Sequence, residues 1–439
     1  MKLSNSYSAF QEDIEEIENY FDRLWPLLRS ITGEGVRKTH DILSEIIPLE
    51  RMEIPSGTCV LDWEVPKEWV VRDAYILTPD GEKILDVWEN NLQLVNYSTP
   101  FKGTMSKSEL ENHLYSIPEL PDAIPYVTSY YKPRWGFCLP DYMRKSMKEG
   151  SYDICIDTEF IQGSMTLSEA VLKGESEREV FLSTYTCHPS MANNELSGPL
   201  ALAFLYKRLA ALPNRRLTYR FVFLPETIGS IAYLAYNGEH LIKTMDAGFT
   251  VTCVGLDAPF TLKKSRQGNS VVDRTAEYIL QYDNTFPYKI LEFFPSGSDE
   301  RQYCSPGYNL PVASLIRGLY AEFPEYHTSL DNKDLISFEA LSQSIEIYYK
   351  ICLALEKNVI YRNVIARGEP FLAKRNLLLG TGAQRKVENE MILLQWLLNF
   401  SDGKHDLISI ANRSGQDFWL LDEIAQRCLE ADLIEIVHG

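Results

Sequence analysis

Two histidines, His188 and His327, stand beside carboxylates at the ends of strand-like segments. Neutral imidazoles and anionic carboxylates at strand ends can ligate zinc in a hydrolytic site, where one further carboxylate stays free as a base. His188 follows the β-forming residues 180–186, and Asn194 and Glu195 come shortly after it. An isolated histidine is more often part of a core, but the polar residues that follow favour a metal ligand here.

Glu226 directly follows the apolar residues 219–225, and Gly229 and Ser230 then turn the chain into a helix. A carboxylate at the end of a buried strand is costly unless it is paired or functional. It could cap the N-terminus of the helix. We favour the role of a general base, which takes a proton from metal-bound water and returns it to a leaving amine.

His327 lies in a polar loop with Tyr326 and Asp331. As a ligand it would complete a set of two nitrogens and two or three oxygens around zinc. Asn194 and Tyr326 are candidates for contacts with a substrate. The remaining histidines lack such neighbours and are expected at the surface: His40, His113, His240, His405 and His438.

Asp257 directly follows the strand-like residues 248–256. An aspartate at this position could equally well be a metal ligand or part of an ordinary turn. Another polar stretch, residues 296–303, lies between apolar strands. Asp299 or Arg301 in this stretch could bind one end of a substrate, or the stretch could be a solvated loop.

The composition is that of an acidic protein with a large core. The chain has 439 residues, of which 45% are hydrophobic, and a net charge of -18. This charge argues against binding to nucleic acid or to an anionic membrane surface. The eight cysteines are scattered without a CxxC pair, which indicates reduced thiols in a cytoplasmic protein. The sequence shows no signal segment and no stretch long enough to cross a bilayer.

The order of the segments predicts several domains. Residues 1–50 are helical and are assigned to the catalytic domain, and residues 51–165 form a β-rich insertion. Strands alternate with helices over residues 166–365, which predicts an α/β sheet that is flanked by helices and binds ligands at its strand ends. Residues 366–439 contain two helices and a final strand, in an order that fits a winged-helix domain.

The insertion also carries an aromatic cluster that includes Tyr126, Tyr131 and Trp135. Such clusters are more often core than ligand site. This one could also form a lid that limits the length of the substrate.

The predicted winged helix has the wrong charge for DNA, because a DNA-binding winged helix should present a basic face. Over residues 402–435 its basic residues are Lys404, Arg413 and Arg427. The acidic residues of the same stretch are Asp402, Asp406, Asp417, Asp422, Glu423, Glu430, Asp432 and Glu435. We therefore interpret this domain as a docking unit for a protein partner, for a second copy of the chain or for the rest of the chain.

Four segments of the sequence resemble the zinc aminopeptidase-like superfamily of M28-type peptidases. They are residues 187–199, 225–230, 297–304 and 325–329. The whole chain resembles an uncharacterised family in which an aminopeptidase-like domain carries a β-rich insertion and a C-terminal winged helix. The resemblance implies a mixed sheet flanked by helices and one or two zinc ions. It also implies His188, Asp257 and His327 as ligands.

The chain departs from the M28 pattern at two positions. Asn194 stands where a bridging aspartate is expected, and Thr227 replaces the second acid of a Glu-Glu pair whose first member is Glu226. Neither an amide nor a hydroxyl binds zinc as a carboxylate does. We therefore expect one zinc, held by the two histidines and by Asp257 or Glu195, although a second zinc stays open.

The resemblance and the retained residues favour a zinc-dependent hydrolase that cleaves a peptide or an aminoacyl amide, with Glu226 as the base. Its partner would be a small peptide or aminoacyl metabolite. One alternative is a catalytically degenerate binding protein on the same fold. Another is a transferase of the glutaminyl-cyclase type, which needs one zinc.

Overall fold

An eight-stranded mixed sheet is the largest element of the first of two units into which the chain divides. The computed structural model describes residues 11–437 apart from 284, 321, 376 and 378–384. The first unit comprises Met1–Ser270 and Pro287–Tyr349, and the second comprises Val271–Phe286 and Lys350–Gly439. Within the described part of the chain, no helix is long and apolar enough to cross a membrane.

The central sheet has the strand order β1-β10-β12-β11-β13-β16-β14-β15. Strand β11 pairs in parallel with β12 and β13, whereas β10 runs antiparallel to β1 and β12. The bounds are β1 Glu50–Pro55, β10 Ser164–Leu172, β11 Glu179–Tyr185, β12 Thr218–Leu224, β13 Met245–Thr250, β14 Phe260–Lys263, β15 Tyr288–Leu291 and β16 Val312–Arg317. The predicted mixed α/β sheet is thus confirmed.

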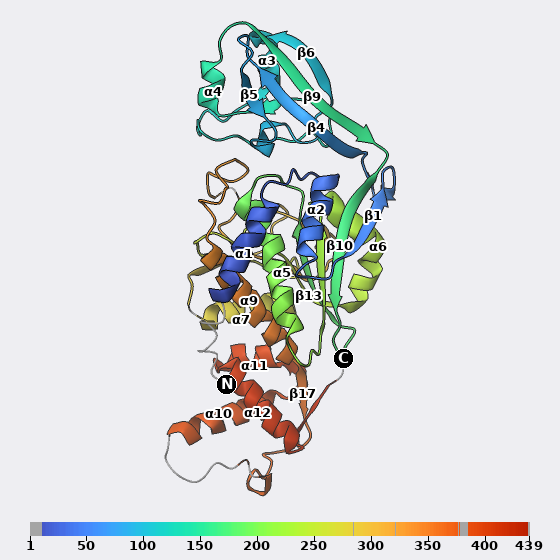
Figure 1. Cartoon of the computed structure of the whole chain (residues 1–439). Helices are drawn as coiled ribbons and strands as arrows, with labels where there is room; N and C mark the ends of the chain where they lie inside the picture. Colours follow the sequence, from blue (N-terminus) through green and yellow to red (C-terminus); the bar gives the residue numbers. More distant parts are fainter. Residues whose placement is uncertain (1–10, 284, 321, 376, 378–384, 438–439) are drawn as a thin grey trace. The chain divides into compact units, whose positions relative to one another are not determined.

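The central strands are buried on both faces. Every residue of β11 is buried, and in β12 only Arg220 is partly exposed. Parallel strands covered by helices on both faces read as continuous apolar runs for this reason. Helix α5 contacts β11 and β12, and α6 contacts β10 (Figure 1). The main helices of this unit are α1 Gln11–Leu24, α2 Glu34–Leu43, α5 Ser197–Ala210 and α6 Ile228–Thr244, and α9 Phe338–Lys357 continues into the second unit.

The β-rich insertion is a separate antiparallel sheet with the strand order β5-β4-β9-β6, grouped with helices α3 and α4 (Figure 1). Buried and exposed residues alternate along β9, as expected of an antiparallel strand with one face in a core. The bounds are β2 Cys59–Val60, β3 Trp63–Glu64, β4 Glu68–Leu77, β5 Lys83–Asp86, β6 Phe101–Ser106, α3 Lys107–Leu110, β7 Leu114–Tyr115, β8 Phe137–Cys138, α4 Asp141–Ser146 and β9 Ser151–Ile161. These strands lie within residues 51–165, which the sequence predicted to be β-rich.

The described part of the second unit combines a three-stranded sheet, β18-β17-β19, with helices α7, α10, α11 and α12 and with the end of α9. Its bounds are α7 Val271–Asp283, β17 Ile360–Asn363, α10 Arg385–Phe400, β18 Asp402–Asp406, α11 Leu407–Ser414, α12 Phe418–Glu430 and β19 Ile434–Ile436. Tyr278 of α7 accepts a hydrogen bond from the N–H of Phe418 at 2.8 Å, which fixes the start of α12. The order of helices and strands is that of the predicted winged helix.

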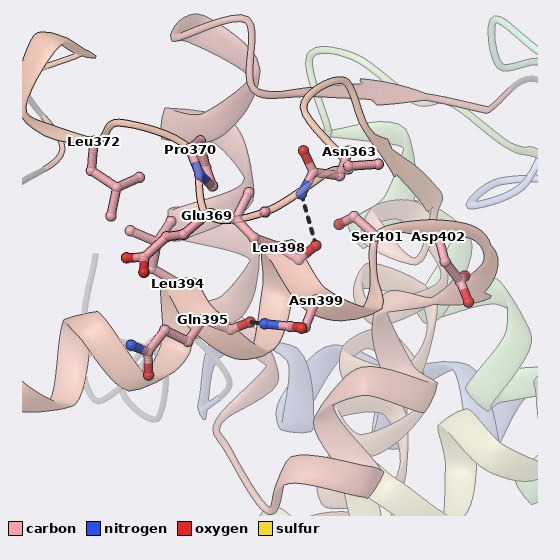
Figure 2. A pocket seen from close by; sticks show the side chains of 12 residues that line it. Asn363, Glu369, Pro370, Leu372, Leu394, Gln395, Leu398, Asn399, Ser401 and Asp402 are labelled. Atoms are coloured by element: carbon pink, nitrogen blue, oxygen red, sulfur yellow. Dashed lines mark hydrogen bonds between the residues drawn. The ribbon is translucent and has the colours of Figure 1, made fainter.

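A pocket of about 560 Å³ lies in the second unit beside α10 (Figure 2). Asn363 lines it and donates to the carbonyl oxygen of Leu398 at 3.0 Å. Its two acidic lining residues are Glu369 and Asp402, and no histidine, cysteine or basic residue lines it. This pocket therefore offers few groups for metal binding or for catalysis.

His40 is a correction to the sequence prediction, because it is buried rather than at the surface. Only 1% of the residue is exposed. Its Nδ1 lies 2.8 Å from the hydroxyl of Ser168 and its Nε2 lies 2.9 Å from that of Thr186, so it joins α2 to the central sheet. His438 lies outside the described residues.

Candidate active site

His188 lies between two carboxylates that face opposite nitrogen atoms of its ring. Nδ1 is 3.1 Å from Oε2 of Glu195, and Nε2 is 3.7 Å from Oε2 of Glu226. The backbone N–H of His188 also donates to Glu195, at 3.0 Å. Burial lowers the pKa of His188 to about 3, and the positive charge of Arg29 adds to the effect. The imidazole is therefore neutral near pH 7, as a metal ligand must be.

Glu195 is fully buried and pairs with the equally buried Arg29. The Nε atom of Arg29 lies 3.4 Å from Oε1 of Glu195 and donates to the carbonyl oxygen of His188 at 2.9 Å. Burial raises the pKa of Glu195, whereas Arg29 and the backbone N–H of His188 lower it and so favour the carboxylate form. Arg29, Glu195 and His188 thus form one buried chain of contacts. Arg29 lies far from the motif segments and was not among the predicted site residues.

Glu226 follows β12 on a strained turn. The N–H of Ile228 donates to the carbonyl oxygen of Glu226 at 2.8 Å, and Thr227 between them has φ +65° and ψ −73°. This γ-turn is rare and strained. Ser298 donates to Oε1 of Glu226 at 2.7 Å. Burial raises the pKa of Glu226 to about 7, while the hydrogen bond from Ser298 opposes the shift. The Glu226 side chain is 26% exposed, so a substrate can reach it.

His327 is held beside His188 by a segment of the β-rich insertion. The N–H of Tyr126 donates to the carbonyl oxygen of His327 at 2.8 Å, and the N–H of Ser329 donates to the carbonyl oxygen of Ile124 at 2.9 Å. The ring centroids of His188 and His327 lie 5.5 Å apart. Burial lowers the pKa of His327 to about 3, so this imidazole is also neutral near pH 7.

Backbone strain gathers around this group of residues. Ser190, Thr227, Cys253 and His327 all have positive φ values between 45° and 65°. Non-glycine residues in such conformations persist only where the surrounding structure holds them, and they cluster at functional sites.

Asn194 is buried in a π-helical turn, Ala192–Leu196, that precedes α5. Its side-chain oxygen accepts a hydrogen bond from the hydroxyl of Tyr185 at 2.8 Å. Its N–H and that of Asn193 donate to the two carboxylate oxygens of Asp331, at 2.9 and 2.7 Å. Asn194, which the sequence suggested for substrate contact, is therefore engaged by the protein. Asp331 was noted only as a neighbour of His327, and its role in holding this turn was missed.

Asp257 does not lie with His188, His327 and Glu226, contrary to its predicted role as a metal ligand. Its side chain is 91% exposed and forms an ion pair with Arg317 at 3.4 Å. A strand was predicted over residues 248–256, whereas β13 ends at Thr250. The chain then turns, with Cys253 at a φ of +51°, and so Asp257 lies away from the strand end.

The other predicted substrate contacts have different positions. Asp299 is fully buried, and its Oδ1 accepts hydrogen bonds from the Thr227 N–H and the Ser230 hydroxyl, both at 2.7 Å. It therefore holds the turn after Glu226. Arg301 donates to the Thr227 hydroxyl at 3.0 Å and lines an open pocket. The ring of Tyr326 stacks on that of His327, with centroids 4.0 Å apart.

Two faces of His188 could meet a metal. On the Nδ1 face, ligand atoms of Cys187, His188 and Glu195 lie within 4.8 Å of one another. However, burial raises the pKa of the Cys187 thiol, which then stays protonated, and Glu195 already faces Arg29. On the Nε2 face, the neutral imidazole meets the partly exposed Glu226 and lies beside His327. The second face suits a catalytic ion, which keeps an open position for substrate.

The fold is that of an aminopeptidase-like protein with a C-terminal winged helix. The chain belongs to the family described as domain of unknown function DUF4910, whose model matches residues 18–358. A model described as winged helix-turn-helix matches residues 359–436. The resemblance inferred from the sequence is thereby confirmed.

Relatives with known names or structures agree with this assignment. A protein of Clostridium acetobutylicum named "putative polysaccharide biosynthesis protein with aminopeptidase-like domain" is 42% identical over 422 residues, which cover 96% of each chain. The crystal structure of a "putative peptidase" from the same organism is 40% identical, with a TM-score of 0.90, and covers 99% of this chain and 100% of that one. The zinc aminopeptidase BSAP of Bacillus subtilis has a TM-score of 0.57 at 13% identity and covers 77% of this chain and 93% of its own. That likeness shows the shared fold alone.

Proposed function

We propose that this protein is a zinc-dependent, aminopeptidase-like hydrolase that cleaves a peptide or aminoacyl amide bond in a small substrate. The observation that carries the proposal is the meeting of His188, His327 and Glu226 where β11 and β12 end. Ligands bind at the carboxyl ends of strands in α/β sheets.

His188, through Nε2, and His327 would supply two nitrogen ligands to one zinc ion, one ligand fewer than catalytic zinc sites usually have. When bound, zinc would polarise the scissile carbonyl and lower the pKa of water, so that the water is more easily deprotonated and attacks the carbonyl as hydroxide. Glu226 accepts a proton from the attacking water and passes it to the leaving amine. Its pKa, which burial raises to about 7, suits both steps near neutral pH. Ser298 holds Oε1 of Glu226, so Oε2 stays directed toward His188.

We assign Glu195 to the orientation of His188 rather than to zinc binding, which revises the sequence prediction. Metal-bound histidines commonly donate their second ring N–H to a carboxylate, which fixes the tautomer and the ring orientation. The contact between Glu195 and Nδ1 of His188, braced by Arg29, has this form. Nε2 is then free for the metal.

The test combines zinc content with turnover. We expect about one zinc per chain in the wild type by elemental mass spectrometry, and loss of zinc in His188→Ala and in His327→Ala. Glu226→Gln should keep its zinc and lose at least roughly a hundredfold in turnover of a panel of aminoacyl amides, because general-base catalysis contributes that much or more. If Glu226→Gln loses zinc as well, Glu226 is a ligand and its assignment as the base is wrong.

A binding protein without catalysis is the second candidate, and the state of Asn194 and Thr227 favours it. The side chain of Asn194 accepts a hydrogen bond from Tyr185. Thr227 has a hydroxyl group at a position where a second metal ion would need a carboxylate. A wild-type protein that binds no zinc when it is supplied would support this candidate. Zinc binding with conversion of N-terminal glutamine to pyroglutamate would instead support the cyclase-type reaction.

The name of the Clostridium relative places it in polysaccharide biosynthesis. We therefore include aminoacyl amides of amino sugars among the candidate substrates. Hydrolysis of such amides, compared with that of simple dipeptides, would distinguish a metabolite hydrolase from a peptidase.

A further inference from the structure

An open pocket of about 610 Å³ lies beside the turn that follows Glu226. Thr227 lines it, and so do Arg301 and Arg266. No aspartate or glutamate is among its lining residues, although the chain holds 61 acidic residues against 43 lysines and arginines. The pocket is therefore basic within an acidic protein.

Both arginines of the pocket are available to a ligand. Arg301 donates through Nη2 to the Thr227 hydroxyl, and its buried Nε has no hydrogen-bond acceptor among the described residues. Arg266 is exposed and donates through Nη1 to the side chain of Asn309 at 2.8 Å. Neither guanidinium lies within salt-bridge distance of a carboxylate in the described part of the chain. Most other arginines of the first unit are paired with acids, as Arg29 and Arg220 are.

Aromatic rings from the region of the insertion form another wall of the pocket. Trp63 of β3 and Tyr131 meet edge to face, with centroids 5.3 Å apart, and Tyr131 is 67% exposed. Burial raises the pKa of the Tyr131 hydroxyl, and Cys187 and Glu226 add to this. The pocket lies next to the proposed base, because Thr227 lines it and directly follows Glu226 in the chain.

We propose that this pocket is a subsite for a carboxylate of the substrate, which Arg301 and Arg266 bind while Trp63 and Tyr131 contact the adjoining apolar part. The proposal rests on the proposed function, because it specifies the substrate of the same site. Guanidinium groups bind carboxylates through paired, charge-assisted hydrogen bonds. The carboxylate can come from an acidic side chain before the scissile bond or from the chain end after it.

Binding to Glu226→Gln tests the proposal without turnover. Calorimetry with zinc supplied would compare two pairs of probes that differ only in charge. The first pair is the α-amide of L-glutamate against L-glutaminamide, and the second is L-leucyl-L-leucine against its C-terminal amide. We expect the carboxylate to bind roughly tenfold more tightly in one pair, since hydrogen bonds to charged groups are the stronger ones. The pair that shows the preference identifies the source of the carboxylate.

Further substitutions in the Glu226→Gln background connect the preference to the pocket. Arg301→Gln should remove it, Arg301→Lys should keep part of it and Arg266→Gln should reduce it. Arg23→Gln makes the same charge change at an arginine that pairs with Glu45 on the surface, and it should have no effect. Should Arg301→Gln fail to fold, Arg266→Gln still decides the matter, because its side chain is exposed.

The proposal is wrong if no probe binds, if neither pair shows a preference, or if the preference survives both arginine substitutions. These outcomes are separate from failure of the proposed function. Wild-type protein that binds carboxylates through Arg301 but hydrolyses no amide would retain the subsite and reject the hydrolase. Hydrolysis without a preference for charge would do the reverse.

Discussion

The Nδ1 atom of His188 lies 3.1 Å from a carboxylate oxygen of Glu195, while Nε2 of the same ring faces Glu226 at 3.7 Å. One imidazole therefore separates a buried carboxylate from a reachable one. The buried carboxylate has Arg29 as its counter-charge. Glu226, which is partly exposed, accepts a hydrogen bond from the hydroxyl of Ser298 and can exchange protons with a substrate. This division supports the proposed roles, which are orientation of His188 for Glu195 and base catalysis for Glu226.

Glu195→Gln should weaken zinc binding by roughly 10–100-fold, the usual cost of removing a carboxylate that orients a ligating histidine. The amide keeps the size of the side chain but loses its charge. Competition against a chromogenic chelator would measure the affinity. Glu179→Gln is a matched control, because Glu179 is also a buried glutamate paired with an arginine, Arg220, but lies at the opposite end of β11 from His188. An equal loss of affinity in both variants would contradict the orienting role.

Thr227→Gly should be about 1 kcal/mol more stable than Thr227→Ala, because only glycine adopts a φ of +65° without strain. Both variants lose the hydroxyl that accepts a hydrogen bond from Arg301, so the comparison isolates the backbone. Midpoints of urea unfolding would measure the difference. We also expect slower turnover in the glycine variant, because a freer turn holds Glu226 less firmly. Equal midpoints would show that the turn is not strained.

His40 should make the fold sensitive to acid. Burial lowers its pKa to about 3 from an ordinary value near 6.5, so the folded state keeps this imidazole neutral while the unfolded chain takes up a proton. The unfolded state then binds more protons, and the free energy of unfolding falls as the pH drops from about 6.5 toward 3. His40→Gln should reduce that slope by up to about 1.4 kcal/mol per pH unit.

Urea unfolding at several pH values would measure both slopes. His188 and His327, whose pKa values burial also lowers, contribute equally to the wild type and to the variant, so the difference belongs to His40. Parallel pH dependences in the two proteins would show that His40 is not held neutral in the fold.

The winged helix should not bind DNA, because acidic residues outnumber basic ones over residues 402–435. Fluorescence anisotropy with a labelled duplex at low salt should show no binding by the full chain. Binding that weakens steeply as salt is added would contradict this prediction, since counterion release is characteristic of phosphate contacts. We propose a protein partner for this unit, which cross-linking in cell extract followed by mass spectrometry would seek.

Patterns along the chain predicted the elements on which the site stands. The apolar runs before His188 and Glu226 are β11 and β12, because a buried parallel strand needs continuous apolar residues. The segment resemblance identified the aminopeptidase-like fold and the winged helix, both of which the structure and the family models bear out. Asp257 does not lie at a strand end, contrary to the prediction. Pairing with neighbouring strands sets where a strand ends, and β13 ends before the apolar residues that follow it do.

The sequence by itself determined which residues stand at strand ends, because neighbouring residues decide where an apolar strand forms and where a small or polar residue ends it. Only the tertiary structure decided what each side chain does there. Glu195 lies against Nδ1 of His188 and against Arg29, which comes from a distant segment of the chain. His40 became a core residue because two hydroxyls meet it across the fold. Such contacts join residues more than a hundred positions apart, and no local pattern records them.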